Sequence, residues 1–235
     1  MLNADLSEIL EAARPHGWVL EPEALRLLET SGVPVPRFAW ARSPAEALAA
    51  AAAIGYPVAA KVVSPQVLHK SDVQGVQPGI ADGEGLALAY ERFRRLPGFQ
   101  GVIVAEMLSG HELIVGAKLD FQFGPVILLG IGGTAVEIYK DTATRMAPLK
   151  ASDVHSMFTC LRGSRLLTGH RGQAAVNLAK LTEMALKFSD LVMALGDRID
   201  SIDLNPVFCS PERCVVADAR IVLAQNATPP PKKAD

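Results

Sequence analysis

The sequence has few cysteines, no excess of charge of one sign and no long apolar run, and each shortage excludes a class of protein. Three cysteines among 235 residues, with no CxxC pair, are too few for a disulfide framework. The 23 basic and 25 acidic residues give a net charge of −2, and no lysine–arginine cluster is present, so we expect no nucleic-acid partner. The longest apolar run in the first half, Ala47–Ile54, is far shorter than the ~20 residues that span a bilayer.

The N-terminus also lacks the apolar core of a signal peptide and carries Asp5 and Glu8 early. We therefore expect a cytoplasmic protein without a membrane partner. An apolar content of 49% excludes disorder and predicts a well-formed core. The length suffices for one large domain or two small ones.

Helical and strand-like segments alternate along the first half of the chain, which predicts a smaller α/β unit. Ser43, Pro44 and Glu46 form a helix start with a capping box. The other expected helices and strands of this half are helices at 21–32 and 82–95 and strands at 37–41, 56–63 and 101–108.

After about residue 108, apolar stretches separated by Gly, Asp or Pro predict an antiparallel or mixed sheet. We expect an α+β protein with an N-terminal extension and smaller lobe over 1–107, a larger lobe over 108–224 and a disordered tail over 225–235. The predicted elements of the larger lobe are strands near 111–120, 124–133, 135–140 and 145–149, helices at 151–161 and 172–195, and a hairpin over 201–208 and 213–224.

The terminal hairpin brings polar side chains together if Pro211 and Glu212 form its tip. Asn205 then lies opposite Asp218, with Asp203 two residues away on the same strand face. Carboxylate and amide oxygens suit Mg²⁺. Alternatively, Asp203 and Asp218 cap strand ends at the surface, and a one-residue bulge would break the register. The same register pairs Cys209 with Cys214, which we expect to be free thiols.

Closely spaced glycines over 130–133 follow an apolar strand, with Lys140 and Arg145 just beyond. Glycines let backbone N–H groups approach a phosphate, but this pattern matches neither the dinucleotide nor the P-loop motif. A tight turn between two strands is the alternative. An arginine among apolar strands usually meets an anion or a carboxylate.

Four further side chains are candidates for chemistry. His69 lies in a loop rich in turn formers, and imidazole is a good phosphoryl acceptor, although a lone loop histidine is more often simply solvated. Lys61 lies in an apolar strand, where it needs an anion unless it snorkels to water. Glu106 ends another apolar strand and Glu112 follows a Ser-Gly turn, and each alone reads as an ordinary strand-end charge.

Taken in order, several segments resemble the ATP-grasp β subunit of the NDP-forming acyl-CoA synthetases, which include the ADP-forming acetate–CoA ligases. The resemblance covers about residues 20–223, and it extends more distantly to the β subunit of succinyl-CoA synthetase. The matching segments are GYPVAAKVVSP, LHKSDVQGV, HELIVGAKLDFQFGPVILLGIGGTAVEIYKD, RMAPL, LLTGHRG and IDLNPV with VADARI.

The resemblance implies an ATP-grasp fold that binds ATP or ADP between two lobes. Lys61 matches the strand lysine that meets the nucleotide phosphates. Glu106 matches the hinge-strand carboxylate near adenine and ribose, with Glu112 as a weaker candidate. His69 matches a histidine thought to relay the phosphoryl group between subunits.

The resemblance also implies a Mg²⁺ site and a glycine-rich phosphate segment. Asn205 and Asp218 match the Mg²⁺ ligands, with Asp203 close by. Arg145 would help to neutralise charge during phosphoryl transfer. The segment that carries it matches the family pattern GG-x-x-x-E-x-x-x-D-x-x-x-R at Gly132, Gly133, Glu137, Asp141 and Arg145.

In that family a partner α subunit or domain binds CoA, and the overall reaction is acyl-CoA + ADP + phosphate ⇌ acid + CoA + ATP. This chain has no candidate CoA-binding unit, so the resemblance implies half of an enzyme, a separate subunit or an excised domain, that forms a hetero-oligomer.

The chain departs from the family pattern between Gln74 and Gly79. Gln74 stands where the family usually has a glycine, and Pro78-Gly79 interrupts the strand that follows. This departure leaves an alternative reading, in which a degenerate ATP-grasp module acts as a nucleotide sensor or interaction domain. A ligase that forms an acyl phosphate on its own is a weaker reading, because no second substrate domain is visible.

Overall fold

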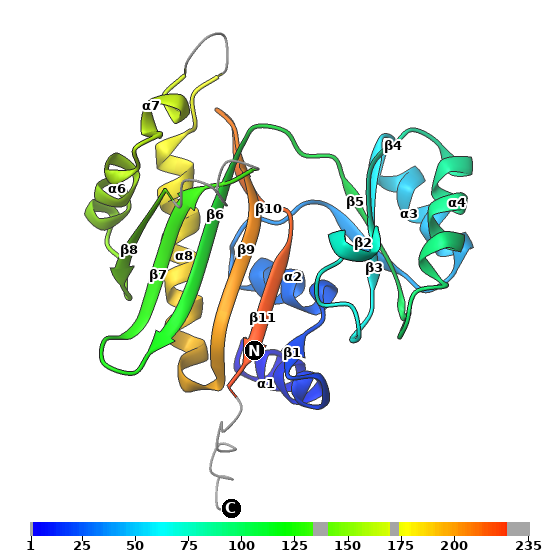
Figure 1. Ribbon diagram of the computed structural model, residues 1–235, viewed down its shortest axis with the longest axis horizontal. Helices are drawn as coiled ribbons and strands as arrows, with labels where there is room; N and C mark the ends of the chain where they lie inside the picture. The colour runs from blue at the N-terminus through cyan, green and yellow to red at the C-terminus, as the bar shows by residue number, and fades with distance from the viewer. Residues whose placement is uncertain (1, 134–140, 170–173, 225–235) are drawn as a thin grey trace, which may run out of the picture.

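The computed structural model describes residues 2–133, 141–169 and 174–224, with side chains from Leu6 onward. Their strands form two antiparallel sheets that lie side by side (Figure 1). The small sheet has the order β2 (Phe38–Ala41), β5 (Gly101–Glu106), β3 (Val58–Val63) and β4 (Val76–Ile80). The large sheet has the order β1 (Trp18–Val19), β11 (Ala219–Leu223), β9 (Ile199–Cys209), β6 (His111–Asp120), β7 (Gly124–Ile131) and β8 (Thr142–Met146), with β10 (Cys214–Val216) also paired to β9.

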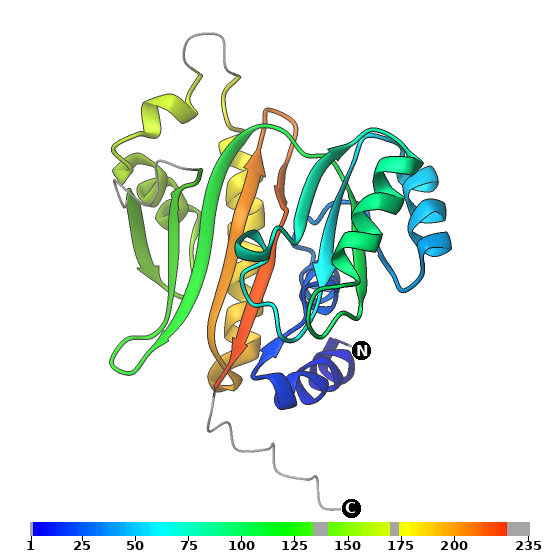
Figure 2. The same cartoon turned by 45° about the vertical axis from the view of Figure 1, so that its right-hand side comes forward.

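Helices cover one face of each sheet and leave the other face of the large sheet open (Figures 1 and 2). On the small sheet these are α3 (Pro44–Ile54) and α4 (Gly83–Phe93), and beside the large sheet lie α1 (Leu2–Ala13), α2 (Glu21–Thr30), α6 (Ala151–Cys160), α7 (Ser164–Leu167) and α8 (Leu178–Leu195). Single 3₁₀ turns span Arg14–His16, Ser71–Val73 and Gly196–Arg198.

The long helix α8 shows how the sequence sets these packing choices. Asn177 caps its start, because the side-chain oxygen accepts from the Lys180 N–H at 3.1 Å, and Gly196 ends it at φ 56°. Leu181, Met184 and Phe188 recur at helical spacing and are buried in the core of the large sheet. Helix α8 therefore covers one face of the large sheet and leaves the other face accessible.

The N-terminal segment packs against the large sheet, in a buried core that also includes Val63 and Ile103 of the small sheet. Trp18 and Val19 pair with β11, and Leu25 and Leu28 of α2 lie in the same buried core as the large sheet. The small sheet itself ends at Glu106, next to the predicted boundary. Residues that precede Val33 thus contact both sheets, and the expected division of the chain into lobes stays a prediction.

Most predicted elements are present, with differences at their ends. Half of the expected capping box forms: the Glu46 N–H donates to Ser43 Oγ at 3.2 Å, whereas Glu46 Oε2 accepts at 2.8 Å from the N–H of Arg42, one residue before the cap. The helix expected from residue 172 begins at Leu178. The stretch expected near 135–140 and the expected tail lie outside the described residues. Among the helices described, none combines the length and apolarity needed to cross a membrane.

Strand β4 forms in spite of Pro78 and Gly79, at the edge of the small sheet, where a missing N–H is tolerated. Its pairing with β3 shifts register between Val58 and Ala60. A bulge there accommodates one more residue on β4 than on β3. Gln74 adopts the left-handed conformation at φ 53° and ψ 33°. The departure from the family pattern is therefore absorbed by one strained residue and one bulge.

Replacing Gln74 by glycine is expected to raise the free energy of unfolding by up to about 1 kcal/mol, because only glycine enters the left-handed region without a Cβ penalty. The adjacent Gly75→Ala variant should be destabilised, since a Cβ there would lie 2.6 Å from Val62 Cγ1. Urea unfolding of both variants measures the two effects. A destabilised Gln74→Gly variant would show that the glutamine makes contacts outweighing its strain.

Candidate functional site

The C-terminal ribbon adopts the register expected from the sequence. Arg220 pairs with Asp203 and Ala219 with Leu204, so Asn205 lies opposite Asp218, whose carbonyl oxygen accepts from the Asn205 N–H at 3.2 Å. Cys209 pairs with Cys214, and both are free thiols. The ribbon thus presents two carboxylates and one amide oxygen to the same side.

Two lysines and two carboxylates meet at Asp218 and form what we call the charge cluster, Lys61, Lys70, Glu21 and Asp218. Lys61 Nζ donates to Glu21 Oε1 at 2.6 Å and to the Ala217 carbonyl at 2.5 Å, and it lies 3.5 Å from Asp218 Oδ2. Lys70 Nζ lies 3.2 Å from Asp218 Oδ2. Lys70 Nζ also lies 2.8 Å from Glu21 Oε2 and forms an ion pair with it, although the two groups are not aligned for a hydrogen bond.

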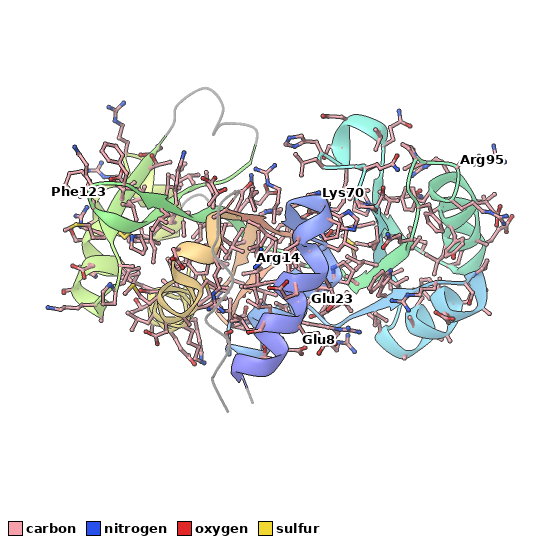
Figure 3. All side chains as sticks on the ribbon, turned by 90° about the horizontal axis from the view of Figure 1, so that it is seen from below. Glu8, Arg14, Glu23, Lys70, Arg95 and Phe123 are labelled. Atoms are coloured by element: carbon pink, nitrogen blue, oxygen red, sulfur yellow. The ribbon has the colours of Figure 1, made fainter. Side chains whose placement is uncertain are left out.

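The charge cluster joins three separate parts of the chain. Glu21 begins α2 and is 2% exposed, Lys61 lies on β3, and Lys70 lies in the loop after β3. Seen from below, Lys70 lies between the two lobes, whose outer ends are marked by Phe123 and Arg95 (Figure 3). The cluster therefore connects the small sheet to the large one.

Electrostatics favour the charged forms of the two lysines and of Asp218. Burial alone would lower the pKa of Lys61, but the carboxylates of Asp218 and Glu21 outweigh it and raise that pKa above its ordinary value. The same two carboxylates outweigh burial at Lys70 and raise its pKa as well. Burial would raise the pKa of Asp218, but the two ammonium groups hold it below the ordinary range.

His69 lines a pocket of about 230 Å³ beside this cluster. The pocket brings together the β3–β4 loop and the C-terminal ribbon, because its walls include Lys70, Ser71, Asp72, Asp203, Asn205, Asp218 and Arg220. Burial raises the pKa of Asp203, helped by the nearby Asp218 carboxylate and opposed by Arg220 and His69. The histidine therefore shares one polar cavity with all three predicted Mg²⁺ ligands.

A second pocket, of about 380 Å³, lies on the open face of the large sheet. Its walls are mostly apolar residues of β6, β7 and β9, such as Ile114, Val126 and Leu128. Asp203 and Asn205 line this pocket as well as the one that contains His69. The two oxygen-bearing side chains therefore stand at the junction of an apolar cavity and a polar one.

Glu106 lies where the chain crosses from the small lobe to the large one. Its Oε1 accepts from the Arg37 N–H at 3.1 Å and from Arg213 Nη1 at 3.1 Å. Burial would raise the pKa of Glu106, but these donors lower it below the ordinary value. Arg37 precedes β2 of the small sheet and Arg213 lies in the turn between β9 and β10, so Glu106 links the lobes.

The glycine segment is held by close packing against β6. The Gly132 N–H donates to the Glu112 carbonyl at 2.6 Å, and a Cβ on Gly132 would lie 2.8 Å from that carbonyl. Gly133 adopts φ 82°, and the Glu112 side chain is exposed. In this structure the Gly132 amide is thus used by the backbone, as the tight-turn alternative requires. Glu137 lies outside the described residues.

A family model described as an ATP-grasp domain matches residues 11–223. The β subunit of ADP-forming acetate–CoA ligase I from Pyrococcus furiosus is 39% identical over 232 residues, covering 94% of this chain and 98% of that protein. The chain belongs to the ATP-grasp family, among the β subunits of ADP-forming acetate–CoA ligases.

The fold agrees with solved structures of this family. The dinucleotide-forming acetyl-coenzyme A synthetase 1 of Ca. Korarchaeum cryptofilum, in complex with coenzyme A and Mg-AMPPCP and with its phosphohistidine segment pointing towards the nucleotide binding site, gives a TM-score of 0.81 at 34% identity. That match covers 92% of this chain and 98% of the other. The ADP-forming 4-hydroxybutyrate–CoA ligase of Nitrosopumilus maritimus is 35% identical over 92% of this chain, which spans 32% of that protein.

The structure does not bring Arg145 of this ATP-grasp chain to the site. Thr144 lines the pocket on the open face, so Arg145, its neighbour on β8, points to the helix-covered face. Arg145 Nη2 donates to Ser156 Oγ of α6 at 2.6 Å. In this arrangement Arg145 is engaged by α6, so its action on the phosphoryl group is not supported by the geometry.

Asp141, four residues upstream of Arg145, has a structural task. Its two carboxylate oxygens accept from the N–H groups of Arg162 and Gly163, each at 2.8 Å. These bonds fix the loop between α6 and α7. The family segment therefore holds the edge of the large lobe in place.

Sequence reasoning missed Glu21 and Arg220 and noted Lys70 only as a neighbour of His69. For Arg220 a signal existed, since it follows Asp218 by two residues and must share its strand face. For Glu21 the sequence shows only an ordinary acidic residue in the first turn of a helix. Its contact with Lys61, 40 residues away, depends on tertiary packing.

Proposed function

We propose that this chain is the nucleotide-binding subunit of an ADP-forming acyl-CoA synthetase, and that it exchanges a phosphoryl group between ATP and His69. The observation that carries the proposal is the position of Asp203 and Asn205, which line both the His69 pocket and the cavity on the open sheet face. A nucleotide in the open-face cavity would point its phosphates toward these residues, with His69 on their other side.

The donor set suits a hard divalent cation. Asp203, Asn205 and Asp218 offer carboxylate and amide oxygens to one polar cavity, which is the chemistry that Mg²⁺ prefers. Bound there, Mg²⁺ would neutralise phosphate charge. Lys61 and Lys70 already lie at Asp218 and would offer two further cations to the phosphates.

The transfer step balances without any further reagent. The unprotonated ring nitrogen of neutral His69 donates its electron pair to the γ-phosphorus of ATP, and the bond from that phosphorus to the β,γ-bridging oxygen breaks. The electron pair of the broken bond leaves with ADP, and the proton on the other ring nitrogen is retained. The reverse step returns the phosphoryl group to ADP.

The partner would be a CoA-binding α subunit or domain of the same synthetase. The Pyrococcus furiosus relative is itself a β subunit, and the Nitrosopumilus maritimus relative is about three times as long as the matched region. Leu68 and Val73, in the same loop as His69, are 44% and 38% exposed, so this loop presents apolar surface near the histidine. Such a surface suits a protein that receives the phosphoryl group from His69.

The test uses the chain with Mg²⁺ and ATP labelled at the γ-phosphate. We expect an acid-labile, base-stable label on the wild type and none on His69→Ala, because phosphohistidine has that stability pattern. His155→Ala is the matched control, since His155 lies exposed on α6, and it should keep the label. A label that persists in His69→Ala would exclude the relay, and nucleotide binding without any label, even with a CoA-binding partner, would favour the sensor alternative.

A further inference from the structure

Arg220 lines the His69 pocket, and its guanidinium group has only part of the hydrogen-bond partners that it could take. It lies on β11, two residues after Asp218, and its side chain is 31% exposed. Its ion pair with Asp203 is long, with 3.8 Å between Nη2 and Oδ2. Within the described residues its Nε is buried and has no hydrogen-bond partner.

A buried donor without a partner is unusual, because native proteins satisfy most such groups and leaving one unsatisfied is costly. A guanidinium group presents its N–H donors in a planar fork that matches the oxygens of a phosphoryl group. Asp203 occupies only one end of this fork. The free side of the guanidinium therefore suits an oxyanion that enters the pocket.

We propose that Arg220 binds the phosphoryl group while that group is attached to His69. The inference rests on the proposed transfer through His69, because Arg220 and His69 line the same cavity. Nε and an adjacent N–H would donate to two phosphoryl oxygens, and the long contact with Asp203 would be exchanged for them. Arg220 would thereby stabilise the charge on the phosphohistidine and extend its lifetime.

The first measurement is the amount and lifetime of the base-stable label after removal of nucleotide. For Arg220→Gln we expect a loss of about 100-fold, the size seen when one charge-stabilising donor is removed from an active site. Arg220→Lys keeps the charge but loses the fork and should recover only part of the label. Affinity for Mg·ADP, measured by calorimetry, should fall far less than the label in both variants, and Arg95→Gln at the outer end of the small lobe is the control that should change neither.

The second measurement separates this inference from the proposed function. Inorganic phosphate is titrated into unlabelled protein and followed by phosphorus NMR, and we expect binding to the wild type that Arg220→Gln abolishes. If the wild type is never labelled but this difference is seen, the transfer through His69 fails while the anion site stands. Equal phosphate binding and equal label lifetime in wild type and Arg220→Gln would overturn the inference, as would a parallel loss of nucleotide affinity and thermal stability.

Discussion

Replacing Glu21 by glutamine is expected to lower the free energy of unfolding by about 3–5 kcal/mol, the usual cost of removing one partner from a buried ion pair. Glu21 is 2% exposed and balances Lys61 and Lys70 together with Asp218. Without its charge, two buried ammonium groups would face a single carboxylate. The variant should therefore unfold at much lower denaturant concentration.

Urea unfolding followed by circular dichroism measures this loss. Glu29→Gln removes the same charge from an exposed position of α2 and should change little. Combining Glu21→Gln with Lys61→Met leaves only the Lys70–Asp218 pair, so the double variant should recover much of the loss. If Glu21→Gln is as stable as Glu29→Gln, the charge cluster does not hold the two lobes together in solution.

Replacing Asp218 by asparagine is expected to weaken Mg·ADP binding by roughly 100-fold or more, since even the loss of an outer-shell partner of a metal costs about 10–100-fold. The substitution removes one of two carboxylates from the predicted cation site and an anion from both lysines. ADP without Mg²⁺ should lose less affinity than Mg·ADP. Calorimetry with each form measures both quantities.

The matched control is Asp200→Asn, because Asp200 lies exposed on β9, three residues before Asp203. Its Mg·ADP affinity should equal that of the wild type. Titrations belong at a temperature at which melting curves show the Asp218→Asn variant to be folded. Equal affinities of Asp218→Asn and wild type for Mg·ADP would remove Asp218 from the cation site.

The register of the terminal hairpin could be predicted over most of its length because a short turn sets it. Once Pro211 and Glu212 form the tip, the pairing follows as far as Ser201 and Val222, and Asn205 lies opposite Asp218, before the register shifts at Leu223. Arg145 failed for the same physical reason, because a strand sends alternate side chains to opposite faces. Nothing in the sequence around β8 reveals which face bears the helices, so the side to which Arg145 points could not be predicted.

The charge cluster could not be predicted because its members come from three distant parts of the chain. The sequence predicts that Lys61, if buried, needs an anion, but it does not indicate which carboxylate binds the lysine. That choice depends on how α2 packs against β3, and such packing has no local pattern. The expected fold class and the ATP-grasp family are confirmed, whereas the expected division into lobes stays a prediction, because the core around the N-terminal residues includes residues of both sheets.

The place of Glu21 has a consequence for dissecting the chain. A shortened polypeptide that starts after Val33 would retain all four strands of the small sheet and most of the large one, and it would keep every residue that the family resemblance assigns to catalysis. It would nevertheless lack Glu21 and the edge strand β1, leaving Lys61 and Lys70 with one carboxylate. Glu21 of α2 thus supports the two lysines beside the proposed nucleotide site, and we expect truncation there to weaken nucleotide binding.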